Sequence, residues 1–131
     1  MLRRTAVLAL ALLLASPALA QDKARTERVQ FAKGASSKAI KGAVKGYDGV
    51  DYVVGLRQTL KVDMKTSNAS SYFNVTAPGA DSALFIGSTS GGSFKGVVPK
   101  TGDYTIQVYL MRNAARRGET ANYTLAVGAT G

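Results

Sequence analysis

The feature that most constrains the fold of this chain is the alternation of apolar and polar residues between Asp103 and Met111. Residues two positions apart point to the same face of a β-strand, so one face of this segment is continuously apolar. That face carries Tyr104, Ile106, Val108 and Leu110. Four such side chains in one row need a hydrophobic core to cover them. We therefore predict a strand that packs against the core of the domain.

Shorter segments of the same character recur along the chain, separated by turn-forming residues such as Gly, Ser, Pro and Asp. We predict strands at 26–32, 38–45, 52–54, 58–66, 72–76, 83–86, 94–98 and 122–127. Segments 87–93 and 112–118 are predicted to be loops, Gly55 to end the third strand, and 128–131 to pack against nothing. Eight or nine short strands without an amphipathic helix predict an all-β fold, an antiparallel β-sandwich with jelly-roll-like or Greek-key connections.

The first twenty residues have the form of a secretory signal peptide. Two arginines, Arg3 and Arg4, precede an apolar run at 7–14 and a small-residue cleavage site that ends at Ala20. The apolar run is too short to span a bilayer as a helix, and we expect no membrane span. The predicted organisation is a cleaved signal peptide at 1–20 and a single β-sandwich domain at 21–131.

The balance of charge is basic after removal of the signal peptide. Residues 21–131 contain 15 basic and 8 acidic residues, which gives a net charge of +7. A basic protein attracts anionic partners. Because the chain is predicted to be exported, we expect no nucleic-acid partner and at most weak association with anionic polymers of the cell envelope. Charge that only keeps the protein soluble explains most of the lysines equally well.

The sequence offers little for catalysis. It contains no His and no Cys, which removes the Ser-His-Asp and Cys-His arrangements and the usual zinc ligand sets. Its eight acidic residues show no spacing typical of an acid/base pair, and Asp48 with Asp51 are too few carboxylates for a tight calcium site. We therefore predict that the protein is not an enzyme and holds no metal and no cofactor.

Side chains suited to recognition lie in two predicted turns. Tyr47 is at the tip of the turn at 46–51, and Arg112, Arg116 and Arg117 follow the strand that ends near Met111. Arginine forms bidentate pairs with carboxylates, and Tyr and Arg are enriched at the energetic centres of protein interfaces. The plain alternative is that these arginines only keep a turn soluble.

Three segments resemble the periplasmic inhibitors of g-type (goose-type) lysozyme. They read GYDGVDYVVG at 46–55, KTSNASSYFNV at 65–75 and GDYTIQVYLMRNAARRGE at 102–119. The similarity extends from about residue 28 to residue 127 and is most specific in YLMRNAARRGE. The resemblance implies a periplasmic β-sandwich that blocks the catalytic cleft of a g-type lysozyme with its loops and so protects peptidoglycan.

The resemblance also implies which residues bind the enzyme. Tyr47, Arg112 and Arg116 match family positions, Arg117 adjoins them, and the loop at Ser90-Gly91 is expected to reach the enzyme as well. An arginine against the catalytic carboxyl of lysozyme would occupy the space of the sugar. The alternative is an exported sugar- or polyanion-binding β-sandwich module, in which the same arginines contact glycan or phosphate.

Overall fold

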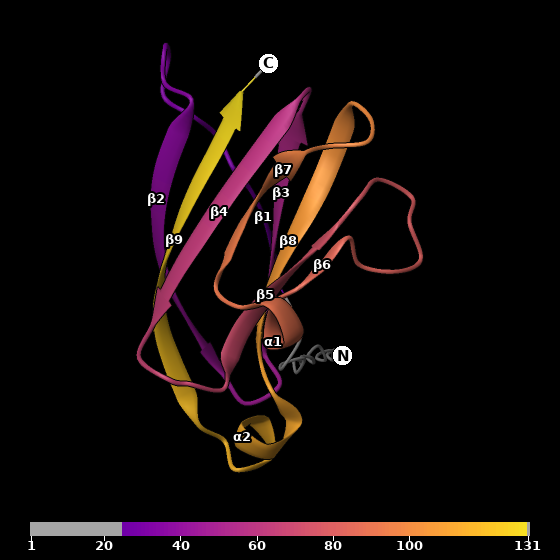
Figure 1. Ribbon diagram of the computed structural model, residues 1–131. Helices are drawn as coiled ribbons and strands as arrows, with labels where there is room; N and C mark the ends of the chain where they lie inside the picture. Colours follow the sequence, from indigo (N-terminus) through magenta and orange to yellow (C-terminus); the bar gives the residue numbers. More distant parts are fainter. Residues whose placement is uncertain (1–24, 131) are drawn as a thin grey trace, which may run out of the picture.

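A computed structural model describes residues 25–130, so the predicted signal peptide lies outside the described residues. The described residues form nine strands and two short helices, arranged as two facing sheets (Figure 1). The strands are β1 (Arg25–Arg28), β2 (Ser37–Lys45), β3 (Val50–Leu56), β4 (Thr59–Thr66), β5 (Ser71–Thr76), β6 (Phe85–Ile86), β7 (Ser93–Val97), β8 (Gly102–Leu110) and β9 (Thr120–Thr130). The helices are α1 (Gly87–Ser90) and α2 (Arg112–Arg116). The predicted all-β sandwich is confirmed.

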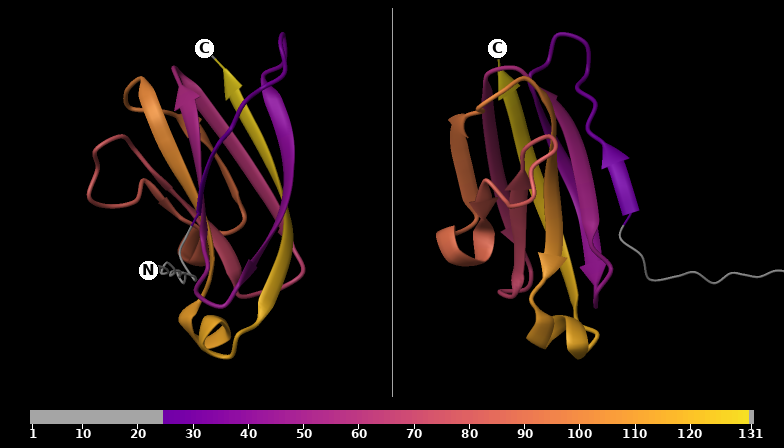
Figure 2. Two further views of the ribbon diagram at one scale, coloured as in Figure 1. Left: turned by 180° about the vertical axis from the view of Figure 1, so that it is seen from behind. Right: turned by 90° about the vertical axis from the view of Figure 1, so that its right-hand side faces the viewer.

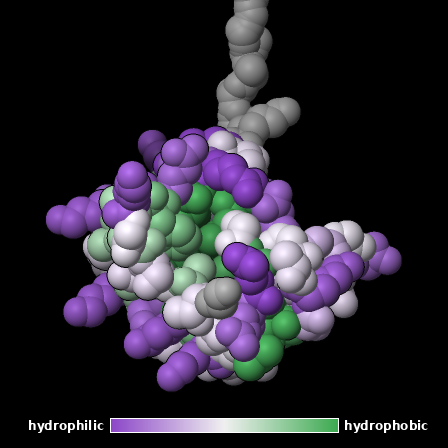
Figure 3. All heavy atoms as spheres, turned by 90° about the horizontal axis from the view of Figure 1, so that it is seen from above, coloured by the Kyte–Doolittle hydropathy of each residue, from purple (hydrophilic) through white to green (hydrophobic). Residues whose placement is uncertain are grey.

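One sheet has the order β1-β3-β8-β5-β6 and the other has the order β2-β9-β4-β7. Every pairing is antiparallel except that of β1 with β3. Figure 2 shows the two layers from behind and from the side, with α2 at one end of the sandwich. Figure 3 shows the opposite end from above, where apolar surface is bordered by hydrophilic residues. Neither helix of the described chain is long and apolar enough to cross a membrane.

Strand β8 occupies the position that its alternation predicted. It lies between β3 and β5, and its four inward side chains are all buried. Opposite them, β9 buries Ala121, Tyr123, Leu125 and Val127 from the second sheet. Alternation in these two central strands therefore builds both sides of the core.

Two buried tyrosine hydroxyls meet in the core. The hydroxyl oxygens of Tyr52 and Tyr123 lie 2.6 Å apart, and the two rings meet edge to face. Burial, and then the hydrogen bond with Tyr52, raise the pKa of Tyr123 above its ordinary value of 10.0. Gly42 makes room for the pair, since a Cβ at this position would lie 2.5 Å from the Tyr123 hydroxyl oxygen. The two hydroxyls thus satisfy each other away from water.

A row of three aromatic rings joins the two sheets on the side where α1 lies. Phe73 in β5 packs on Phe85 in β6 at a centroid distance of 5.2 Å, and Phe85 packs on Phe94 in β7 at 5.2 Å. Phe73 is fully buried, whereas the other two rings are half-buried. Because β6 and β7 are the outermost strands of their sheets, this row closes one open side of the sandwich.

Several predicted strand bounds are wrong. The first strand ends at Arg28 and not at residue 32, and β6 begins at Phe85, two residues later than predicted. Gly55 does not end the third strand, because β3 continues to Leu56, which is buried. Gly55 lies beneath a bidentate pair in which Arg28 donates to Asp103 at 2.7 and 3.0 Å. Residues 128–130 also pack, since β9 pairs with β4 as far as Thr130 and Ala129 contacts the core, whereas Gly131 lies outside the described residues.

The two segments predicted to be loops each contain a short helix. At 87–93 the chain forms α1 before β7 begins, and at 112–118 it forms α2. Helices of four and five residues are about one turn long, so they show no apolar period that a sequence could reveal.

Candidate functional site

The short helix α2 places the arginine cluster at one end of the sandwich. Met111 leaves β8 in an extended conformation, and the helix then turns the chain back toward β9. Ala114 and Ala115 are buried against the end of the core, whereas Arg112 and Arg116 are exposed. Gly118, at a φ of 69°, closes the turn by donating its N–H to the Ala115 carbonyl at 2.9 Å.

The turn between β2 and β3 lies beside α2 and carries Tyr47. The side chain of Tyr47 is 65% exposed, a high value for an aromatic residue. Gly46 has a φ of 59° and donates its N–H to the Glu119 carbonyl at 2.9 Å. Its Cα faces the carbonyl of Ala115, which a Cβ would meet at 3.6 Å. The turn between β2 and β3, which carries Tyr47, therefore lies at the same end of the molecule as α2, which carries Arg112 and Arg116 (Figure 1).

A third segment, the turn between β4 and β5, holds this end together through Asn68. The Asn68 amide nitrogen donates to Glu119 Oε1 at 3.0 Å and to the Thr120 carbonyl at 3.3 Å. Its amide oxygen accepts the N–H of Ser70 at 2.9 Å, and the Ser70 carbonyl accepts the N–H of Met111 at 2.9 Å. Three loops from different parts of the chain are thus fixed to one another.

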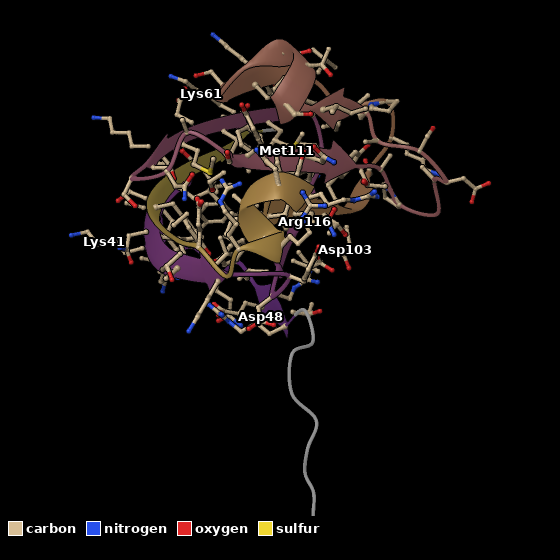
Figure 4. All side chains as sticks on the ribbon, turned by 90° about the horizontal axis from the view of Figure 1, so that it is seen from below. Lys41, Asp48, Lys61, Asp103, Met111 and Arg116 are labelled. Atoms are coloured by element: carbon tan, nitrogen blue, oxygen red, sulfur yellow. The ribbon has the colours of Figure 1, made fainter. Side chains whose placement is uncertain are left out.

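The three arginines differ in their surroundings. Arg117 donates Nε to Glu119 Oε2 at 2.7 Å and forms an ion pair with the same carboxylate. Within residues 25–130, Arg112 and Arg116 form no ion pair and no side-chain hydrogen bond. Figure 4 looks directly onto this end, with Met111 and Arg116 around α2. We call the surface formed by Tyr47, Met111, Arg112 and Arg116 the α2 end.

The other predicted contact, at Ser90-Gly91, is on a separate projection. Both residues are exposed at the end of α1, where the Gly91 N–H donates to the Gly87 carbonyl at 2.8 Å. In Figures 1 and 2, α1 lies beside β5 and β6 in the half of the molecule nearer to α2. No hydrogen bond between described residues joins α1 to α2 or to the turn that carries Tyr47.

Three residues of this end were missed by the sequence prediction. Asn68 and Glu119 are 51 positions apart in the chain, so their hydrogen bond depends on the folding of both sheets. Met111 is 38% exposed, as its place on the outward side of the alternation indicates, but its position beside the arginines was not predicted to form part of a surface. One local feature of the sequence could have indicated a role for Glu119. It lies two residues after Arg117, which carries the opposite charge, just before a strand.

We expect Glu119→Gln to lower the urea midpoint of unfolding at pH 7 and to have less effect in acid. Hydrogen bonds from Asn68 and Arg117 lower the pKa of Glu119 below its ordinary value of 4.5. A lowered carboxyl pKa stabilises the folded state above pH 4.5, and this contribution disappears as the pH falls through the folded value. Urea titrations between neutral and strongly acidic pH test this. Glu27→Gln, at the exposed carboxylate in β1, is the control, and an equal, pH-independent loss in both variants would contradict the prediction.

The chemistry of the α2 end is that of binding. Among residues 25–130, no group of three or more acidic side chains could hold a metal ion. The surface offers instead an exposed aromatic ring and two guanidinium groups on a fixed backbone. These features are typical of one class of protein, a β-sandwich that recognises a partner through exposed loops at one end.

Comparisons with known proteins identify the family. A curated inhibitor of g-type lysozyme from Escherichia coli K12 is 33% identical over 129 residues, which cover 95% of this chain and 93% of the relative. No family model matches the chain. The chain belongs to the family of g-type lysozyme inhibitors, and the resemblance found in the sequence is confirmed.

Solved structures agree with this assignment. The periplasmic inhibitor of g-type lysozyme (PliG) from Aeromonas hydrophila has a TM-score of 0.74 and 40% identity, covering 81% of this chain and 97% of its own. A mutant of the Escherichia coli inhibitor has a TM-score of 0.63 and 28% identity, and the match covers 80% of this chain and 97% of the mutant. The Salmonella Typhimurium inhibitor has a TM-score of 0.62 and 26% identity, and the match covers 79% of this chain and 96% of that inhibitor.

Proposed function

We propose that this protein inhibits g-type lysozyme by placing the α2 end in the catalytic cleft of the enzyme. The observation that carries the proposal is the juxtaposition of exposed Tyr47 with two guanidinium groups, Arg112 and Arg116, that have no ion-pair partner in the described chain. The curated relative, which the chain matches over nearly its whole length, is an inhibitor of this enzyme class. Inhibition needs no reaction, because a bound loop excludes the substrate.

The chemistry of the two surfaces is complementary. A lysozyme cleft is shaped for a glycan and contains catalytic carboxyl groups. A guanidinium can form two parallel hydrogen bonds with a carboxylate, and a tyrosine ring fills a sugar-sized space at a low cost in side-chain entropy. Arg112 or Arg116 would pair with a cleft carboxylate, and Tyr47 would occupy the position of a sugar ring.

The fixed backbone of the α2 end favours tight binding. Hydrogen bonds from Gly46, Asn68 and Met111 hold the three loops before any partner arrives, so less entropy is lost on association. Arg117, paired with Glu119, lies at the rim and helps to keep this arrangement. Ser90 and Gly91 on α1 would provide a second, smaller contact with the enzyme.

We also propose that the protein acts in the periplasm. The three relatives of known structure are described as periplasmic inhibitors. Export would use residues 1–20 as a cleaved signal peptide and leave a single inhibitor domain at 21–131. In this compartment the protein would protect peptidoglycan from lysozyme that crosses the outer membrane.

A lysis assay with the purified chain 21–131 tests this function. We expect a g-type lysozyme to be blocked near one equivalent of protein and a c-type lysozyme to remain active. Inhibition should persist in moderate salt, because fitted loops depend less on screened charge than a polyanion-binding surface does. An active g-type enzyme in the presence of excess folded protein would refute the proposal and favour the sugar- or polyanion-binding module.

A further inference from the structure

The outer face of the four-stranded sheet carries a group of lysines that the α2 end does not use. Exposed lysines on this face alternate with inward residues such as Val44 in β2 and Val62 in β4. The group consists of Lys41, Lys45, Lys61, Lys65 and Lys95. In Figure 4, Lys41 and Lys61 lie on the same side of the molecule, away from Arg116. Lys45 ends β2 next to the turn that carries Tyr47, whereas Lys41 and Lys61 lie away from the α2 end.

The lysines flank a trough along the central strand β9. Lys41 of β2 and Lys65 of β4 both pair with Thr124, one from each side. Because neighbouring strands are about 4.8 Å apart, the two lysine Cα atoms lie roughly 10 Å from each other across β9. The outward residues of β9 between the lysine-bearing strands have short side chains or none: Asn122, Thr124, Ala126 and Gly128. The long lysine side chains of β2 and β4 thus border a trough whose floor is formed by the short side chains of β9.

Two depressions follow this strand. The larger, of about 480 Å³, is lined by Lys41, Lys65, Asn122 and Thr124, among others. The smaller, of about 150 Å³, lies farther along β9, where its lining includes Lys61, Asp63, Ala126 and Gly128. From Lys65 to Lys61, β4 advances roughly 13 Å at the usual rise of a strand. The hollow surface is therefore elongated and has cationic groups along its length.

Folding alone does not explain this distribution of charge. Asp63 is the one acidic residue in the four strands of this sheet, and it lies 4.0 Å from Lys61 Nζ and accepts a hydrogen bond from Ser93. Lys61 and Lys95 pair directly across β4 and β7, where like charges are unfavourable. Lysines on edge strands prevent aggregation, but β4 lies inside the sheet. The positive charge of Lys61 and Lys65 thus needs another reason.

We propose that this trough binds a linear polyanionic glycan. Lysine ammonium groups on flexible stems adapt to anionic groups that repeat along a chain, whereas a single carboxylate is better held by arginine. The hydroxyl of Thr124 and the amide of Asn122 on the floor can bond to sugar hydroxyls. A narrow chain can enter the trough, while a flat bilayer would reach only the tips of the lysines. The site is independent of lysozyme inhibition.

Binding assays with two double variants test the proposal. Lys41→Gln/Lys65→Gln removes two charges from the trough, and Lys33→Gln/Lys100→Gln removes two exposed charges from loops elsewhere. The probes are heparin as a sulfated glycan, polygalacturonate as a carboxylated one, neutral dextran, and vesicles of phosphatidylglycerol with phosphatidylcholine. A lysine near an anionic lipid surface contributes about 1 kcal/mol of binding free energy. If each lysine contributes the same here, Lys41→Gln/Lys65→Gln should bind the polyanions about 10- to 30-fold more weakly than the parent protein.

The expected pattern is binding to one or both polyanions but not to dextran, with a near-normal affinity in the loop variant. Preference for sulfate or for carboxylate identifies the anionic group, and either supports the site. Both double variants should inhibit lysozyme as the parent protein does. Equal weakening in the two variants would show that only total charge matters, and binding to vesicles without binding to glycans would indicate a membrane surface. Either result would overturn the proposal.

Discussion

Tyr47→Ala and Arg116→Ala are each expected to weaken inhibition of g-type lysozyme by roughly 1–3 kcal/mol, which is about 5- to 150-fold in the inhibition constant. Both side chains are exposed, and within residues 25–130 neither forms an ion pair or a side-chain hydrogen bond, so their removal breaks no such contact of the fold. The loss should therefore appear in binding and not in stability. Lysis assays titrated with each variant, with circular dichroism to verify folding, measure this effect.

The matched control for Arg116 is Arg57→Ala. Arg57 is an exposed arginine in the hairpin between β3 and β4, which the strand directions place at the end of the sandwich away from α2. Arg57→Ala changes net charge by the same amount and should inhibit normally. Arg117→Ala should have an intermediate effect, because its guanidinium is already held by Glu119. Full inhibition by folded Tyr47→Ala and Arg116→Ala proteins would show that the enzyme is bound elsewhere.

Phe73→Ala is expected to destabilise the protein by about 3–5 kcal/mol, the largest effect on stability that we predict. Phe73 is fully buried and anchors the row of rings that continues through Phe85 to Phe94. Its removal leaves a cavity at the join between the sheets, whereas the backbone of Phe73, on which Gly87 of α1 packs, is unchanged. Urea denaturation of the parent and variant proteins measures the difference in unfolding free energy.

Phe94→Ala provides the comparison for this prediction. Phe94 is the last ring of the row and only half-buried, so the variant should lose less stability than Phe73→Ala. At temperatures where both variants stay folded, inhibition should be close to normal, since none of these rings belongs to the α2 end. A loss below 1 kcal/mol for Phe73→Ala would mean that the row of rings does not hold the sheets together.

The sequence predicted the elements that depend on alternation. In β8 and β9 every second residue is apolar, and both strands lie at the centre of their sheets with those residues buried. Two of the wrong strand ends have tertiary causes. β3 continues through Gly55 because this residue pairs with Asp103 of β8, and β9 extends to Thr130 because it pairs with β4. Neither cause is visible within a local window of sequence.

The residues of the candidate site could be predicted from the sequence, but the contacts that bring them together could not. Tyr47 and the arginines were recognisable as exposed residues suited to binding, and the resemblance selected them. Their convergence depends on the hydrogen bond of Gly46 with Glu119 and on the reach of Asn68 across 51 positions. The helical turn that presents Arg112 and Arg116 is too short to produce a periodic signal.

The most direct test of the central claim is whether the inhibitor and a sugar compete for the same cleft. Calorimetry would measure binding of chain 21–131 to a g-type lysozyme with and without a saturating oligosaccharide of N-acetylglucosamine. If the α2 end occupies the cleft, apparent affinity should fall in proportion to the saturation of the enzyme by sugar. An affinity that is the same with and without the sugar would contradict the account and place the inhibitor outside the cleft.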